Sequence, residues 1–193
     1  MKKFELTNEF ITNMFGTKLF RIRALVEFGD VEAGELGGYV EKESNLGHDD
    51  NAWVYDNAWV YGDAQVSGDA RVYGDAQVSG NALVCGNALV YDNAWVYGNA
   101  LVCGDARVCG NGDYAYAHGF GSVNRTTTFF RLKDGGVGVR CGCFYGTLAQ
   151  FRDKIRETHG ETKKAQEYLM LADLMELRFE EDENEVGNRK YVE

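Results

Sequence analysis

Residues 51–70, NAWVYDNAWVYGDAQVSGDA, repeat one six-residue unit, and this unit decides the fold. From Asn51 to Gly110 the chain divides into ten consecutive units of the form Asn/Asp-Ala-x-Val-x-Gly/Asp, without a slip. Alanine and valine stand two residues apart, so both point to the same side of an extended strand. The Gly-Asp and Gly-Asn pairs between units supply turn residues that tolerate positive φ. The pattern therefore predicts short strands separated by tight turns.

Such short strands must stack on one another, because no single unit can bury its own apolar side. Three turns close a triangle, which predicts a parallel β-helix with about 18 residues per coil and an interior of alanine and valine. Weaker units flank the regular ones: Asn45–Asp50 places Leu46 in the alanine slot and His48 in the valine slot, and Tyr114 and Phe120 continue the valine register. We therefore expect a mainly β fold with a β-helix over residues 51–122.

The two ends of the chain have a different composition. Residues 1–50 contain an alternating strand pattern at 19–26 and an imperfect unit at 37–40, so we expect a β cap that protects the open end of the β-helix. Residues 123–193 predict a small α+β module of the type ββαα. Its signals are strands at 126–133 and 137–144 around a Gly-rich turn, a capping box at 147–150, helices ending near 160 and 179, and an acidic tail.

The regular unit resembles that of the hexapeptide-repeat left-handed β-helix superfamily, and left-handed winding is what this resemblance implies. Two further stretches, LFRIRALVEFGDVEAGELGGYVEKESNL at 19–46 and FFRLKDGGVGVRCGCFYGTLAQFRDKIRETHG at 129–160, are similar to the ends of uncharacterised phage, mobile-element and YdcK-type bacterial repeat proteins. The resemblance implies a phage-type context and a bacterial host. It brings no established activity.

Composition narrows the classes of function. The formal net charge of −10 argues against binding to duplex nucleic acid, which normally needs a basic surface. No apolar run approaches the roughly 20 residues of a membrane span, and the first residues do not have the pattern of a signal peptide. Five cysteines without a disulfide-scaffold spacing favour reduced thiols in the cytoplasm. We expect no cofactor and no metal site, because Cys141-Gly142-Cys143 has no second ligand pair at a recognisable spacing.

The outward x positions differ among the three faces of the predicted β-helix. Tyrosine and tryptophan alternate with arginine on the first face, and these residue types are common at binding hot spots and stack on nucleobases. They also favour strands and stabilise one another across rungs, and both interpretations stay open. The candidate binding residues are Trp53, Tyr55, Arg71, Tyr73, Tyr91 and Arg107. The third face is small and apolar, which predicts packing against the C-terminal module or a second copy of the chain, through Leu83, Cys85, Leu101 and Cys103.

Acyl transfer is the enzymatic alternative, because many proteins of the resembled superfamily are trimeric acyltransferases with a histidine base. The chain has three histidines, His48, His118 and His159, and His118 at the end of the repeat is the best placed. The units lack the loop excursion that usually frames an acyl-donor site. We therefore predict a non-catalytic phage or mobile-element binding protein, acting as a counter-defence inhibitor in the bacterial cytoplasm. Its partner is expected to be a host protein or a small nucleotide-type ligand, and self-association into a homo-oligomer is also expected.

Overall fold

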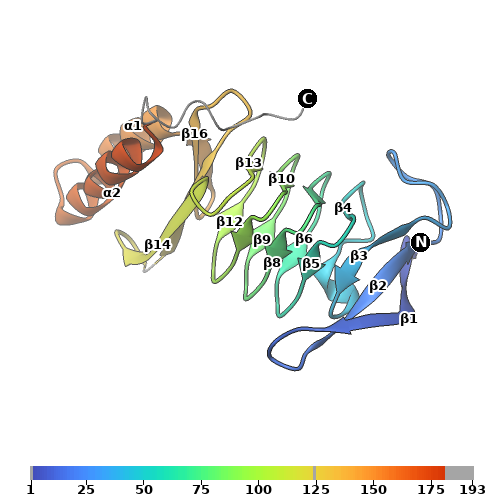
Figure 1. The fold of residues 1–193 in the computed structure, drawn as a ribbon. Coiled ribbons are helices and arrows are strands. Elements are labelled where there is room, and N and C mark those ends of the chain that lie inside the picture. Colours follow the sequence, from blue (N-terminus) through green and yellow to red (C-terminus); the bar gives the residue numbers. More distant parts are fainter. Residues whose placement is uncertain (1, 124, 181–193) are drawn as a thin grey trace.

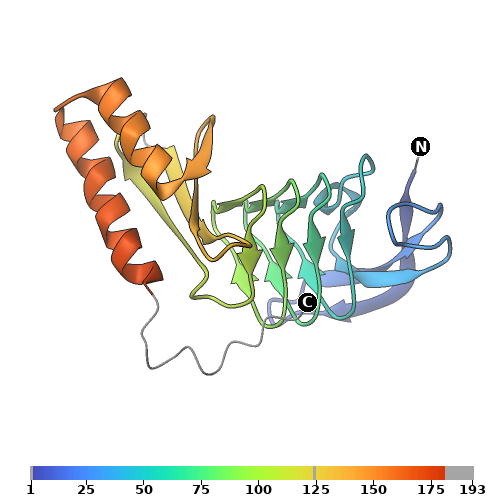
Figure 2. The same ribbon diagram turned by 90° about the horizontal axis from the view of Figure 1, so that it is seen from above.

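The computed structural model describes residues 2–123 and 125–180, and its central part is a parallel β-solenoid (Figures 1 and 2). Each repeat unit contributes one strand of two residues. These strands are β4 (Trp53–Val54), β5 (Trp59–Val60), β6 (Gln65–Val66), β7 (Arg71–Val72), β8 (Gln77–Val78), β9 (Leu83–Val84), β10 (Leu89–Val90), β11 (Trp95–Val96), β12 (Leu101–Val102) and β13 (Arg107–Val108). The predicted parallel β-helix is confirmed, while its left-handed winding stays a prediction.

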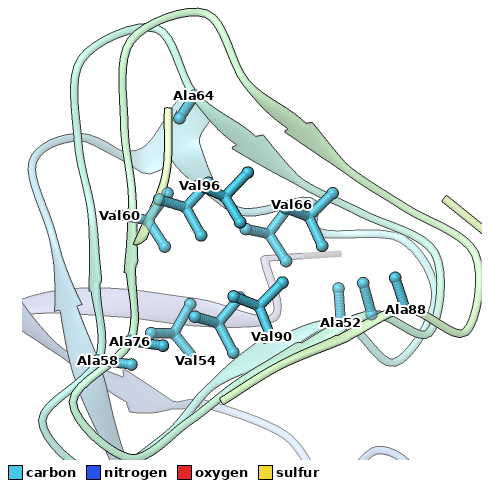
Figure 3. Close-up of a cluster of buried hydrophobic side chains, with 14 of the residues drawn as sticks. Ala52, Val54, Ala58, Val60, Ala64, Val66, Ala76, Ala88, Val90 and Val96 are labelled. Carbon is cyan, nitrogen blue, oxygen red and sulfur yellow. The ribbon is translucent and has the colours of Figure 1, made fainter. Parts of the chain in front are cut away.

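Stacked strands are 18 residues apart, as the period predicts. Val54 pairs with Val72, Val72 with Val90 and Val90 with Val108, and the other two faces follow the same spacing. The repeat valines and alanines are at most 1% exposed and form one continuous core. Figure 3 shows these side chains converging from the three sides of the triangle. Because the interior is narrow, alanine near each corner and valine at each side fill it.

The corners combine positive φ with polar ladders. Glycine occupies most of these positions, and Asp56 and Asp92 adopt φ of 50° and 55° in its place. Asn and Asp alternate along one corner: the Asn51 amide donates to the Asp69 carboxylate over 2.8 Å, and the Asn87 amide donates to the Asp105 carboxylate over 3.1 Å. Amide donors thus separate carboxylates that would repel one another if stacked directly.

The N-terminal cap extends one sheet of the solenoid. Its elements are β1 (Phe4–Thr12), β2 (Lys18–Ala24), β3 (Leu36–Val40) and the short 3-10 helix η1 (Glu43–Asn45), and the sheet order is β1-β2-β3-β5-β8-β11. β1 is not among the strands predicted from the sequence. β3 pairs with β5 in parallel, with Val40 beside Val60, so residues 37–40 are the imperfect unit that the sequence indicates.

The predicted register of Asn45–Asp50 is wrong. Leu46 is paired with Val66, so it occupies a valine slot and not an alanine slot, and it is 2% exposed. His48 is not in the valine register; its ring stacks on Phe4 at 4.5 Å, and its Nδ1 accepts a hydrogen bond from the Lys3 amide. Leu46 lies 20 residues from its partner, two more than the regular coil, and the additional residues form the loop that carries His48.

The C-terminal end of the solenoid is closed by side chains in place of a further coil. Asn111 Oδ1 accepts from the Trp95 amide, and the Tyr114 hydroxyl donates to the Trp95 carbonyl over 2.8 Å. Thr128 Oγ1 accepts from the Leu101 amide at the edge of the third face, and Asp113 accepts from the amides at 109 and 110 at the edge of the first face. Side chains thus satisfy backbone amides at all three sheet edges, and an antiparallel bridge between Ala106 and Leu132 adds backbone pairing, so the end is protected against the addition of another strand.

The C-terminal module is an antiparallel sheet with two helices packed on one side, as Figure 2 shows. Its elements are β14 (Tyr114–Phe120), β15 (Arg125–Arg131), β16 (Val137–Cys141), β17 (Phe144–Thr147), α1 (Leu148–His159) and α2 (Lys163–Phe179). The predicted capping box at Thr147 is present. The sheet has two more strands than the predicted ββαα arrangement. β14 leaves the valine register after the buried Tyr114, so Phe120 is 45% exposed, contrary to the prediction. Tail residues 181–193 lie outside the described residues.

Candidate functional site

The predicted first-face cluster does not form one continuous exposed surface. Trp53 points outward from its strand but is completely buried, because the N-terminal cap folds over it. The rings of Phe4 and Phe28 lie against it at 6.2 and 5.3 Å, both edge-on. The placement of Trp53 on an exposed binding face is therefore wrong.

The next two members of the cluster are held by the same cap. Asp30 accepts a hydrogen bond from the Tyr55 hydroxyl at 3.1 Å and from the Arg71 guanidinium at 2.9 Å. Burial raises the pKa of the Tyr55 hydroxyl well above its ordinary value, so it stays a neutral donor. These two side chains anchor the loop that carries Asp30, which gives them a structural role.

The remaining members form a ladder that is half-buried. The rings of Tyr73 and Tyr91 are parallel, with centroids 5.1 Å apart and an interplanar angle of 7°. Arg107 donates to the carbonyls of residues 87 and 106. Beside Tyr91, burial and the neighbouring Asp113 raise the pKa of the Cys109 thiol to about 11. Stacking between rungs is thus present on this face, and a binding role for it stays a prediction.

The third face contains a disulfide where sequence analysis expects reduced thiols. Cys85 and Cys103 stand one coil apart with Cα atoms 4.6 Å from each other, within the range that a disulfide spans, and they are bonded. The prediction that both cysteines are free is wrong for this structure, since stacked coils bring positions 18 residues apart into bonding distance. The backbone amide of Leu101 donates a hydrogen bond to Thr128 Oγ1 of the C-terminal sheet, and Leu83 is half-buried. Coverage of this face by a second copy stays a prediction.

The candidate catalytic histidine is exposed in a shallow hollow at the end of the solenoid. His118 Nδ1 lies 3.0 Å from Thr126 Oγ1, and Asn81, Asn99 and Arg125 line the same hollow. His159 is at the end of α1, where its ring stacks on Tyr168. Within residues 2–123 and 125–180, no three His, Cys, Asp or Glu side chains gather as a metal site would require. Neither α1 nor α2, the helices of the described part, has the length and apolar character needed to cross a membrane.

An aromatic groove lies where the second face of the solenoid meets the C-terminal module. We define it by its lining residues: Trp95, Tyr97, Asn111, Tyr114, Ala115, Tyr116 and Arg178. Its volume of about 600 Å³ is within the usual range of ligand pockets. Trp95 is 41% exposed and Tyr97 is 48% exposed, although both are large aromatic side chains. The aromatic groove is therefore a concave surface at which apolar rings are open to solvent.

Hydrogen bonds to the backbone hold the walls of the aromatic groove in place. Tyr97 is at its centre, with Tyr114 and Tyr116 edge-on at 6.5 and 6.4 Å and Trp95 tilted at 5.6 Å. The Tyr114 hydroxyl donates to the Trp95 carbonyl and accepts from the Tyr97 amide at 3.4 Å. Burial raises the pKa of this hydroxyl to about 12, so it remains protonated at neutral pH. Arg178, near the end of α2, adds a guanidinium to the apolar walls.

The aromatic groove is not among the sites predicted from the sequence, although the sequence contains part of its signal. The second-face ladder ends at Trp95 and Tyr97, and Asn111-Gly112 interrupts the repeat before another coil can cover them. A ladder that ends in large aromatic residues beside such an interruption indicates an uncovered surface. The contribution of Arg178, 83 residues after Trp95, depends on the tertiary fold alone.

A known family model matches part of the repeat region and no other part of the chain. The model described as the YdcK beta solenoid repeat matches residues 64–80, 76–90 and 84–98. These matches all lie inside the solenoid and do not include the cap, the aromatic groove as a whole or the C-terminal module. No curated protein matches the chain. The solenoid of this protein is thus similar to the YdcK β-solenoid repeat.

Proposed function

We propose that this protein is a non-catalytic binding protein of phage or mobile-element type that acts in the bacterial cytoplasm as a counter-defence inhibitor. It occupies a host protein through the aromatic groove. The phage context rests on the resemblance of the two end segments to phage-borne repeat proteins. The binding role rests on the aromatic groove. The sequence-based prediction instead assigns binding to the first face.

The observation that supports this function most directly is the exposure of Trp95 and Tyr97 in a concave site. Leaving large apolar rings in water is unfavourable by about 25 cal/mol for each Å² that a partner could cover. Tryptophan, tyrosine and arginine are also the residues that contribute most at protein interfaces. A groove with these three residue types fits an apolar side chain that projects from a partner and is flanked by an acidic group facing Arg178.

A small nucleotide-type ligand is the second candidate for the same groove. The flat rings of Trp95, Tyr97 and Tyr116 offer stacking surfaces, and stacking contributes about 1–3 kcal/mol per base. Arg178 would pair with a phosphate. Both candidates use the same residues, so one set of variants tests them together.

The test is affinity purification from host cells, with retained proteins and small molecules identified by mass spectrometry. Trp95→Ala and Tyr97→Ala should each weaken retention at least about tenfold, since loss of a hot-spot residue costs about 2 kcal/mol or more. Trp59→Ala is the matched control, because Trp59 is in the same sheet two coils before Trp95 and does not line the groove. The captured partner must then be inhibited by the wild-type protein in a purified assay.

Two results would count against the proposal. A partner retained equally by Trp95→Ala and Trp59→Ala would place binding elsewhere. Turnover of an acyl-coenzyme A donor that disappears in His118→Ala, while the groove variants keep it, would favour the acyltransferase alternative. The first result would refute the assignment of binding to the aromatic groove, and the second would refute the non-catalytic role.

A further inference from the structure

A second pocket lies inside the C-terminal module, away from the aromatic groove, between β16, β17, α1 and the start of α2. It has a volume of about 290 Å³. Its lining residues are Ser122, Arg125, Cys141, Cys143, Phe144, Phe151, Lys154, Ile155, Thr158, His159 and Tyr168. We call it the module pocket. No residue of the solenoid lines it, so its ligand is independent of any partner of the aromatic groove.

The charge of the module pocket is opposite to that of the whole chain. The chain carries 30 acidic and 20 basic residues, yet among the described residues that line this pocket there is no Asp or Glu. Arg125, Lys154 and His159 are all present. Lys154 has an ion pair with Glu157, but both side chains are more than half exposed. Such a surface pair contributes little, so the ammonium can turn to a ligand at small cost.

The pocket combines this basic rim with an apolar interior. Phe151 lies edge-on to Tyr168, with centroids at 5.8 Å, and Phe144 lies 5.3 Å from Phe151. The guanidinium of Arg125 lies directly over Gly142, at a position where any side chain on residue 142 would collide with it. Glycine therefore leaves space for the arginine beside the pocket. A cavity of about 150 Å³ suffices for benzene, so this one has room for a ring and an anionic head group.

We propose that the module pocket binds a small organic anion with an apolar or aromatic body, such as an aryl phosphate or an aryl carboxylate. The ring packs against Phe144, Phe151 and Ile155. The anionic group faces Arg125 and Lys154, with the Ser122 and Thr158 hydroxyls as further donors. Anion and apolar body are both needed, because the exposed Arg125 and Lys154 line the same pocket as the buried Phe151 and Ile155.

The first test is calorimetric titration of the full chain with phenyl phosphate and benzoate, each compared with neutral phenol and benzamide. Each anion should bind at least about tenfold more tightly than its neutral counterpart, since a charge-assisted hydrogen bond differs from a neutral one by about that factor. Arg125→Gln and Lys154→Gln should each remove most of this preference. Arg156→Gln is the matched control: it makes the same change of charge on α1, but residue 156 does not line the pocket and pairs with Asp153.

A second measurement uses the wild-type protein alone. Cys143 is an exposed free thiol that lines the pocket, whereas Cys109 is on the solenoid. Saturating phenyl phosphate should slow the alkylation of Cys143 by N-ethylmaleimide and leave Cys109 unchanged, as followed by peptide mass spectrometry. Equal binding of anions and neutral analogues, or equal losses in Lys154→Gln and Arg156→Gln, would overturn the proposal. Trp95→Ala should leave both readouts unchanged, which separates this site from the proposed function.

Discussion

Replacing Tyr114 by phenylalanine removes one oxygen atom from the end of the solenoid and isolates its effect. The Tyr114 ring is 5% exposed and stays in place, but two backbone groups lose their partner: the Trp95 carbonyl at 2.8 Å and the Tyr97 amide at 3.4 Å. A buried polar group without a partner costs about 1–3 kcal/mol, and the longer bond contributes less. We expect the free energy of unfolding to fall by about 2 kcal/mol.

The assay is urea unfolding followed by circular dichroism and tryptophan fluorescence, together with hydrogen exchange. At this chain length, about 2 kcal/mol corresponds to a lower Tm by roughly 4–8 °C. Exchange should accelerate at the Tyr97 amide, which loses its acceptor. The Trp95 amide should remain protected because Asn111 Oδ1 accepts from it over 2.9 Å. This difference between two nearby amides distinguishes loss of the Tyr114 hydrogen bond from a general destabilisation of the solenoid end.

Tyr61→Phe is the control, because it removes the same atom from a tyrosine that lies two coils before Tyr97 on the same face, away from the C-terminal end of the solenoid. Water can solvate a hydroxyl at the surface in both the folded and the unfolded state. Tyr61→Phe should therefore change the free energy of unfolding by no more than about 0.5 kcal/mol. An equal fall in the free energy of unfolding in both variants would contradict this prediction. So would a wild-type exchange rate of the Tyr97 amide in Tyr114→Phe. Either result would mean that the hydroxyl does not hold the sheet edge.

Three further changes test other parts of the fold. Trp53→Ala should lower the free energy of unfolding in urea by about 3–5 kcal/mol, because a fully buried indole is removed. A loss under about 1 kcal/mol would contradict the burial of Trp53. Gly37→Ala should cost about 1–3 kcal/mol, since its Cβ would lie 2.5 Å from the Val54 carbonyl oxygen, and an unchanged Tm would contradict this close approach. Because burial raises the Cys109 pKa from 9.0 to about 11, the unfolded thiol ionises first, so wild type should lose stability relative to Cys109→Ala between these pH values. Parallel stability curves over that range would exclude the shift.

The solenoid could be predicted from the sequence because its information is local and repeated. Each valine slot is specified by neighbours within six residues, and ten consistent units leave no choice of register. Where the repeat weakens, the local signal becomes ambiguous: leucine fits an alanine or a valine slot, and only the pairing with Val66 places Leu46.

Burial of outward residues depends on contacts far along the chain and could not be predicted in the same way. The strand alternation correctly turned Trp53 away from the solenoid axis, but Phe4 and Phe28 then cover it. The aromatic groove has the same origin, since Trp95 and Arg178 meet only through the module. A repeat therefore predicts the direction of a side chain, and the ends of the chain decide whether solvent reaches it.

The closure of each sheet edge by side chains makes the solenoid a spacer of adjustable length. Because Asn111, Asp113, Tyr114 and Thr128 replace the next coil, the end of the array is the same whichever coil precedes it. Duplicating 18 residues would move the C-terminal module away from the cap by one strand spacing, about 4.8 Å, and keep its orientation. Duplicating six residues would instead rotate the module by one side of the triangle. Duplication of a coil or of a single unit can thus alter the reach and the orientation of the module, while the groove at the end is preserved.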